Sequence, residues 1–278
     1  RNCEKLIVVP DDVLGYLSFD ALVSDLPEVG NSRYNKLNFL IYRHTLSYGY
    51  SGSLFFNRED GKPRRSNVLA IAPSYNNIDS SRQLANNSGI NRNLEKYLIP
   101  LPFTTDEVNA VVKIFKGTQQ VGVNATETGF KASAADYSIL HFAMHTLIND
   151  EDPLASKLVF SLNNDTLNDG FLNTYEIYNL ELNAELAVLS ACQTGAGKLS
   201  KGEGIMSLAR GFLFAGVPGI IMTLWAVEDI SGAEIVTSFY EYLYDGQNKD
   251  VALRKAKLAY LENADQLRAH PYFWAAYV

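Results

Sequence analysis

The most constraining feature of this sequence is a short, continuous apolar run that leads into a cysteine. Residues 186–189 are apolar without alternation, which is typical of a strand buried on both faces of a parallel sheet. Two small residues follow, then Cys192 and a glycine-rich stretch that extends to Gly204. Ligands of open α/β sheets bind outside the carboxyl ends of the strands, so Cys192 stands where a reactive group would be useful.

A second apolar run, residues 138–145, has the same design and ends in His145, just before the polar loop 146–152. If the two strands are neighbours in a parallel sheet, their axes lie about 4.8 Å apart. His145 and Cys192 would then face each other at the same sheet edge. His145 precedes Cys192 by 47 residues, which is close to a recognised nucleophile–base spacing of cysteine peptidases.

Composition limits the classes of protein to consider. The chain has 278 residues, 47% of them hydrophobic and 20% charged, which suits one large α/β domain or a catalytic domain with a smaller companion. A net charge of −7 argues against direct nucleic-acid binding, because phosphate recognition needs clustered Lys and Arg. Two cysteines, Cys3 and Cys192, are too few for a disulfide framework, so we expect a reducing, cytoplasmic location.

The most apolar stretch, residues 211–227, is uncharged but only 17 residues long, and Gly216, Pro218 and Gly219 interrupt it. It therefore predicts a helix, a turn and a buried strand rather than a membrane span. The chain opens without Met and without a signal-peptide pattern. We expect it to be one domain of a longer polypeptide.

Apolar periodicity predicts strands that alternate with helices, which implies βαβ units and a mostly parallel sheet covered on both faces. The charged, turn-rich segment 57–66 is the predicted boundary between a small N-terminal α/β lobe, residues 1–60, and a core, residues 61–278. Predicted strands are 6–9, 37–48, 68–72, 121–123, 139–145, 158–162, 186–189, 219–224 and 272–278. Predicted helices cover 108–115, 125–132, 174–178 (capped by Thr174), 205–213, 235–243 and 253–260.

Each candidate residue also has a plain structural interpretation. Free cysteine is among the most buried residue types, so Cys192 alone could be a core residue. His141 and His145 lie about 13 Å apart along a strand and cannot share a metal there. We interpret His141 as a core histidine and His145 as a general base, while His44 and His270 lack a comparable setting.

Two further patterns need weighing. The segment 195–198, Gly-Ala-Gly-Lys, fails as a phosphate loop because Cys192 replaces the first glycine and Leu199 replaces the required hydroxyl residue. Glu228 and Asp229 follow the strand predicted at 219–224. We favour a helix N-cap with a dipole-matched acid for these two residues. The alternative is the wall of a substrate pocket that prefers a basic side chain.

At these residues the chain resembles the CHAT family, caspase-like domains usually fused to tetratricopeptide repeats, in the clan of caspases, gingipains and separase. The motifs that carry the resemblance are Ile139-Leu-His-Phe-Ala-Met-His145, Leu189-Ser-Ala-Cys-Gln-Thr-Gly195, Gly202-Glu-Gly204 with Leu208-Ala-Arg-Gly-Phe212, and Thr223-Leu-Trp-Ala-Val-Glu-Asp229. Weaker similarity lies at 7–10, 101–103 and 270–277, so the resemblance covers nearly the whole chain.

The resemblance implies a three-layer αβα sandwich and peptide-bond hydrolysis by a Cys/His dyad, Cys192 and His145, without a metal or other cofactor. It places the backbone N–H groups of Cys192 and of Thr146, where the wider clan has glycine, around the oxyanion. It also implies a substrate pocket near Ser74 and Tyr75 and near Glu228 and Asp229.

As partners, the resemblance implies a protein or peptide substrate and an N-terminal repeat region or regulatory protein. The setting it implies is bacterial signalling or defence. Two alternatives stay open: a catalytically silent scaffold for protein–protein interaction, and an acyltransferase or hydrolase that uses the same dyad on small substrates.

Overall fold

The computed structural model describes residues 3–25, 33–50, 67–75, 98–163, 165–190 and 203–278. The chain forms two compact units. One unit consists of residues 65–221, and the other combines residues 1–64 with residues 222–278. Residues 222–278 thus share a unit with the N-terminal lobe. A boundary near residue 60 alone does not express this grouping, because it leaves residues 222–278 with the core.

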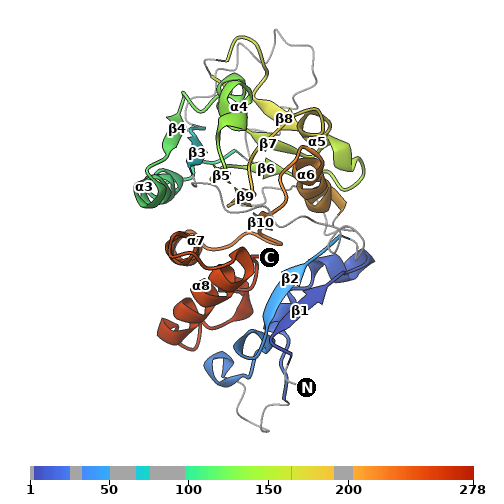
Figure 1. Ribbon diagram of the computed structural model, residues 1–278, viewed down its shortest axis with the longest axis vertical. Coiled ribbons are helices and arrows are strands. Elements are labelled where there is room, and N and C mark those ends of the chain that lie inside the picture. Colours follow the sequence, from blue (N-terminus) through green and yellow to red (C-terminus); the bar gives the residue numbers. More distant parts are fainter. Residues whose placement is uncertain (1–2, 26–32, 51–66, 76–97, 164, 191–202) are drawn as a thin grey trace. The chain divides into compact units, whose positions relative to one another are not determined.

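A five-stranded sheet forms the centre of the unit 65–221, with strand order β10-β9-β5-β3-β4 (Figure 1). β3 pairs in parallel with β4 and β5, and β5 pairs in parallel with β9. Every residue of β3, β5 and β9 is buried, as their unbroken apolar runs predict. The predicted α/β class with a mostly parallel sheet is therefore confirmed. The strands are β3 Val68–Pro73, β4 Thr118–Gly122, β5 Ile139–Phe142, β9 Leu186–Leu189 and β10 Ile220–Met222.

Helices follow the strands of this unit: α3 Thr104–Phe115, α4 Glu127–Ser133, α5 Thr174–Ile177 and α6 Glu203–Phe214. α3 packs on β3, and α4 is capped by Thr126, whose hydroxyl accepts from the Gly129 N–H at 3.1 Å. The predicted Thr174 cap of α5 is wrong by one residue. Asn173 caps the helix and Glu176 completes a capping box, while the Thr174 hydroxyl donates to the Ser156 carbonyl at 2.8 Å.

A second, antiparallel sheet follows β5 directly, with order β6-β7-β8. Its strands are β6 Thr146–Leu147, β7 Lys157–Val159 and β8 Phe171–Asn173. The single strand predicted at 139–145 is therefore wrong at its end, because β5 stops at Phe142 and the chain changes sheets. Apolar runs report burial but do not tell which sheet buries them.

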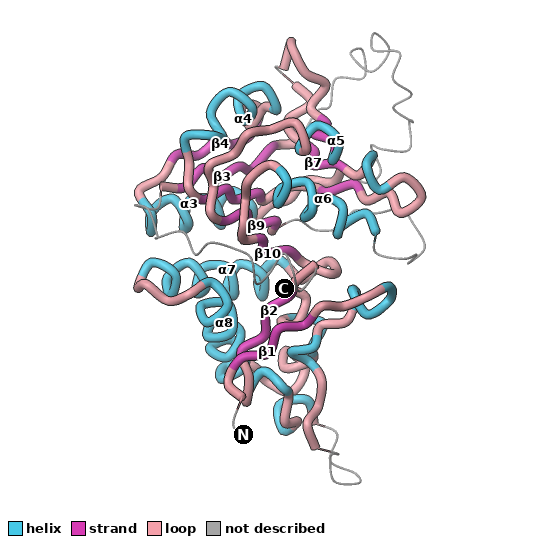
Figure 2. The backbone as a smooth tube through the Cα atoms, turned by 45° about the vertical axis from the view of Figure 1, so that its right-hand side comes forward, coloured by secondary structure: helices cyan, strands magenta, loops and turns pink. Residues whose placement is uncertain are grey.

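The other unit contains a parallel strand pair, β1 Lys5–Val8 and β2 Thr45–Tyr48, and two long helices, α7 Asp229–Tyr244 and α8 Lys249–Asn263. Figure 2 shows α7 and α8 side by side, and α8 also contacts β2. The strand predicted at 272–278 is wrong. A 3₁₀ helix occupies Pro271–Phe273, and Tyr277 forms only an isolated bridge with Thr223.

Short 3₁₀ helices lie in several of the described connections. The predicted strand 37–48 is wrong over its first part, because within this segment only β2 is a strand. The apolar stretch 211–227 becomes the end of α6, a turn and β10, as predicted. Within the described ranges, no helix is long and apolar enough to cross a membrane. The other 3₁₀ helices are Asp12–Tyr16, Phe19–Ala21, Tyr34–Lys36, Leu40–Tyr42, Ala134–Asp136 and Pro153–Ala155.

Candidate functional site

The register of the central strands shows which strands lie beside β5, the strand that precedes His145. Phe142 of β5 pairs with Ile71 of β3 on one side and with Leu189 of β9 on the other. The two strands that precede the candidate residues in the sequence, β5 and β9, are thus neighbours, as the dyad hypothesis requires. His145 lies three residues beyond Phe142, and Cys192 lies three residues beyond Leu189 in the sequence. Cys192 itself falls outside the described residues, so its role stays a prediction.

His145 lies between β5 and β6 with a side chain that is fully buried. Its Nε2 atom is 2.6 Å from the carbonyl oxygen of Ile99. A carbonyl oxygen can only accept a hydrogen bond, so Nε2 carries the proton and Nδ1 carries the lone pair. Nδ1 is buried and has no hydrogen-bond partner among the residues that the structure describes. The arrangement leaves one imidazole nitrogen available to take up a proton.

The electrostatics of the site favour a neutral imidazole. Burial lowers the pKa of His145 below its ordinary value, although the hydrogen bond to Ile99 acts in the opposite direction. A neutral histidine can accept a proton from a thiol, whereas an imidazolium cannot. The geometry and the pKa direction therefore both suit a general base.

Tyr75, predicted at the substrate pocket, lies two residues beyond β3 and is only 5% exposed. Its ring centroid is 4.6 Å from that of His145. Its hydroxyl donates to the Val159 carbonyl at 2.6 Å and accepts from the His145 backbone N–H at 3.1 Å. Burial raises the pKa of the Tyr75 hydroxyl, so the group stays protonated. These contacts with the backbone around His145 are not visible in the sequence.

Thr146, predicted to donate to an oxyanion, begins β6 and pairs with Leu158 of β7. The Val159 N–H donates to the His145 carbonyl at 3.0 Å, which makes 145 and 159 the hydrogen-bonding positions of the ladder. Hydrogen-bonding and non-hydrogen-bonding pairs alternate, so the Thr146 N–H is directed away from β7. Among the described non-glycine residues only Asp12 and Lys116 have positive φ, so this position does not require the clan's glycine.

The remaining predicted site residues have structural contacts. Ser74 is half-buried, and its N–H donates to the Gly122 carbonyl at 3.2 Å. Glu228 belongs to the other unit and is the N-cap of α7, where its carboxylate accepts from the Ser231 hydroxyl at 2.6 Å. Asp229 is the first residue of that helix. The favoured cap interpretation thus holds for Glu228.

The other histidines have the structural settings that the sequence suggests. His141 is fully buried, with Nε2 3.2 Å from a carboxylate oxygen of Glu107, as expected for a core histidine. His270 caps the last 3₁₀ helix by accepting from the Tyr272 N–H at 3.0 Å. In the described part of the chain, no three His, Cys, Asp or Glu side chains gather in a group that could hold a metal ion.

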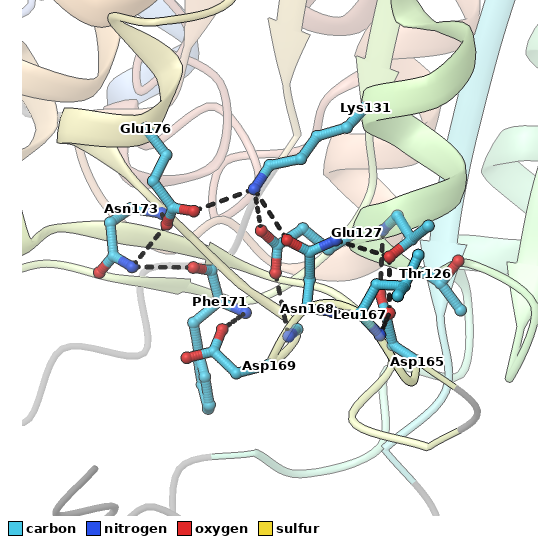
Figure 3. A network of polar contacts seen from close by, with 12 residues as sticks. Thr126, Glu127, Lys131, Asp165, Leu167, Asn168, Asp169, Phe171, Asn173 and Glu176 are labelled. Carbon is cyan, nitrogen blue, oxygen red and sulfur yellow. Dashed lines mark hydrogen bonds and ion pairs between the residues drawn. The ribbon is translucent and has the colours of Figure 1, made fainter. Parts of the chain in front are cut away.

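A polar network supports the small sheet that begins at Thr146 (Figure 3). The Lys131 ammonium of α4 contacts the carboxylates of Glu127 at 2.5 Å and Glu176 at 2.9 Å. Glu176 in turn accepts from the side chain of Asn173, at the end of β8, at 2.8 Å. The network joins β8 and α5 to α4, and β8 is linked through β7 to β6. Two parts of the network leave a sequence signal: the capping box, Asn173 to Glu176, and the i,i+4 pair of Glu127 and Lys131.

These features define a class of protein: an α/β domain with a mostly parallel sheet and, beyond its central strand, a buried histidine next to the strand that leads to a cysteine. This is the caspase-like class. The model of the CHAT domain family matches residues 1–278, and the chain belongs to that family.

Two relatives carry the same region within much longer proteins. Tetratricopeptide repeat protein 28 of Homo sapiens is 24% identical over 247 residues, which is 77% of this chain and 10% of that protein. Tetratricopeptide repeat protein 28 of Mus musculus is 23% identical over 209 residues, which is 64% of this chain and 8% of that protein. The chain spans about a tenth of the length of these curated relatives.

Proposed function

We propose that this chain is a cysteine endopeptidase domain in which His145 is the general base and Cys192 the nucleophile. The observation that carries the proposal is the buried imidazole of His145, whose Nε2 proton is held by the Ile99 carbonyl while Nδ1 keeps its lone pair. The adjacency of β5 and β9 supports it, because Cys192 follows β9 by as many residues as His145 follows β5.

In the proposed reaction, the Cys192 thiol transfers its proton to Nδ1 of His145, and the thiolate attacks the carbonyl carbon of the scissile peptide bond. The backbone N–H groups of Cys192 and Thr146 stabilise the oxyanion of the tetrahedral intermediate. The imidazolium then returns its proton to the leaving amine, and a thioester remains on Cys192. Water attacks the thioester, gives a proton to His145 and releases the carboxylic acid.

The partners of this site follow from the relatives. Both are named for tetratricopeptide repeats, and they are about ten times longer than the matched region. We therefore propose that the substrate is a protein, that a repeat region or regulatory protein presents it, and that the reaction occurs in the cytoplasm. No cofactor takes part in these steps.

A silent caspase-like scaffold is the second candidate, and one observation favours it. The His145 side chain is 0% exposed, whereas a general base must reach the leaving amine of a substrate. A scaffold would keep this histidine purely as a core residue.

Alkylation by iodoacetamide separates the two candidates, because the chain has one other cysteine, the exposed Cys3, which serves as an internal standard. An ordinary thiol is only a few per cent ionised at pH 7, so a His145-activated Cys192 should react about tenfold or more faster than Cys3. His145→Gln should remove that difference. When the rate of Cys192 alkylation is measured against pH, we expect it to fall only below pH 6.5, since burial lowers the pKa of His145.

Cleavage of a peptide library, read by mass spectrometry, tests the reaction directly. Cys192→Ala and His145→Gln are expected to lower cleavage at least a hundredfold, with thermal melting as the control for folding. A Cys192 that reacts no faster than Cys3, together with the absence of any cleavage, would favour the scaffold.

A further inference from the structure

The hydrogen-bond ladder of β6 and β7 is irregular at the pair His145 and Val159, which we call the rung. There the hydroxyl of Tyr75 lies between the two backbones. Positions 145 and 159 face each other, and the Val159 N–H donates to the His145 carbonyl at 3.0 Å. In a regular antiparallel pair, the His145 N–H would return a bond to the Val159 carbonyl. Instead, the His145 N–H donates to the Tyr75 hydroxyl at 3.1 Å, and that hydroxyl donates to the Val159 carbonyl at 2.6 Å.

The ring of Tyr75 is held by apolar packing, as its hydroxyl is held by hydrogen bonds. It belongs to a buried apolar cluster with Leu98, Val159 and Phe171. Leu98 directly precedes Ile99, whose carbonyl accepts the Nε2 proton of His145 at 2.6 Å. The Tyr75 and His145 ring centroids are 4.6 Å apart. The Tyr75 side chain thus contacts the imidazole and the backbone of His145. It also packs on Leu98, the neighbour of Ile99, whose carbonyl orients Nε2.

From this geometry we propose that Tyr75 is the positioning residue of the general base, setting the backbone and ring plane of His145 so that Nδ1 remains the proton acceptor. The inference rests on the proposed peptidase function. A tyrosine is suited to the position because its hydroxyl can accept one hydrogen bond and donate another at once. It fills the widened rung and keeps both backbone groups satisfied in a buried setting.

The substitution Tyr75→Phe tests the proposal, because it keeps the ring and removes only the hydroxyl. The His145 N–H and the Val159 carbonyl then lose their partners, and we expect the rung to close or admit water. Both changes remove the covalent link between this bridge and the Tyr75 ring, so we expect the imidazole to shift relative to Ile99. A displacement of about 1 Å at a catalytic group can lower a reaction rate up to about a hundredfold. We therefore expect Tyr75→Phe to lower the rate of peptide cleavage at least about tenfold.

The matched control is Tyr260→Phe in the other unit. Tyr260 is 6% exposed, against 5% for Tyr75, and its hydroxyl is also hydrogen-bonded, to Ser231 at 3.0 Å. Both variants lose a buried tyrosine hydroxyl and should melt at a lower temperature. Only Tyr75→Phe should change the position and the tautomer of the His145 imidazole.

Two readouts distinguish positioning from plain stability. Nitrogen-15 spectra of labelled histidine report the His145 tautomer, and we expect the single Nε2–H form in the wild-type protein and a mixture in Tyr75→Phe. Iodoacetamide alkylation across pH reports Cys192 against Cys3. We expect the Cys192 profile of Tyr75→Phe to move toward that of Cys3, while Tyr260→Phe keeps the wild-type profile.

The outcomes are separable. A lower melting temperature with unchanged His145 tautomer and Cys192 profile would make Tyr75 a structural residue and overturn the inference. A wild-type Cys192 no faster than Cys3 removes the peptidase proposal, and with it any role of Tyr75 in that reaction. If Tyr75→Phe does not fold, Leu98→Val loosens the packing of the Tyr75 ring and takes its place. An unaltered tautomer in that variant would equally overturn the inference.

Discussion

A buried lysine offers the sharpest test of the structure of the unit formed by residues 1–64 and 222–278. Lys257 of α8 is 1% exposed, and its ammonium donates to the Asp20 carboxylate at 2.6 Å. The carbonyl of Tyr277 is its second acceptor. The side chain of Asp20 is only 8% exposed, so solvent screens this pair weakly. The pair joins the N-terminal segment, α8 and the C-terminal segment.

The perturbation is Asp20→Asn, which keeps the size of the side chain and one acceptor but removes the countercharge. Removing one partner of a buried ion pair costs about 3–5 kcal/mol, because the other charge stays buried. Since the Asn carbonyl and the Tyr277 carbonyl still accept from Lys257, we expect a loss near 3 kcal/mol. Lys257→Met should cost a similar amount by leaving the Asp20 carboxylate unpaired.

The double variant carries the argument. With both charges gone, the desolvation cost disappears, so Asp20→Asn with Lys257→Met should cost at least about 2 kcal/mol less than the sum of the single variants. Urea unfolding followed by tryptophan fluorescence suits the measurement, because both tryptophans, Trp225 and Trp274, lie in this unit. Single variants that cost under about 1 kcal/mol, or strictly additive costs, would refute the reasoning.

Two further predictions concern the unit 65–221. A Cβ at Gly117 would overlap the side chain and the carbonyl oxygen of Val68 in β3, so Gly117→Ala should cost about 2–3 kcal/mol in thermal or urea unfolding. Gly15→Ala, where the added Cβ meets nothing within 4 Å, should stay near zero, and equal costs for the two would contradict the packing argument. Burial raises the pKa of Glu176, but hydrogen bonds from Asn173 and from the network's lysine outweigh it and leave the pKa below its ordinary value. The Glu176 carboxylate therefore stabilises the fold at pH values above the ordinary pKa of glutamate, and this stabilisation is lost as pH falls through the folded pKa. Glu176→Gln should lower the free energy of unfolding by about 1 kcal/mol at pH 7 and leave it unchanged near pH 3. A loss that is the same at both pH values would refute this.

The base of the proposed dyad depends on structure on both sides of it in the chain. Its imidazole is oriented by Ile99, which precedes it by 46 residues, and its backbone is held by the rung shared with Val159. The sheet that contains Val159 is joined in turn to α4 through Lys131 and Glu176. Substitutions in that network are therefore expected to reach the site through the small sheet.

Local sequence patterns determined much of this unit. The unbroken apolar runs at 68–72, 139–142 and 186–189 predict buried parallel strands, and all three are fully buried. Periodicity works here because burial on both faces of a sheet leaves a signal within a few residues. The same pattern selected His145, which lies beyond the end of β5. The adjacency of β5 and β9, on which the dyad hypothesis depends, is shown by the strand register.

Tertiary structure alone decided which partner each side chain met. The resemblance places Tyr75 near a substrate pocket, but no local pattern predicts that its hydroxyl bonds the carbonyl of Val159, 84 residues away. Lys257 has the sequence character of an exposed helical lysine and is instead buried against Asp20, 237 residues away. Periodicity records only how apolar the immediate neighbours are, whereas a hydrogen bond or an ion pair depends on which distant backbone the topology brings into reach.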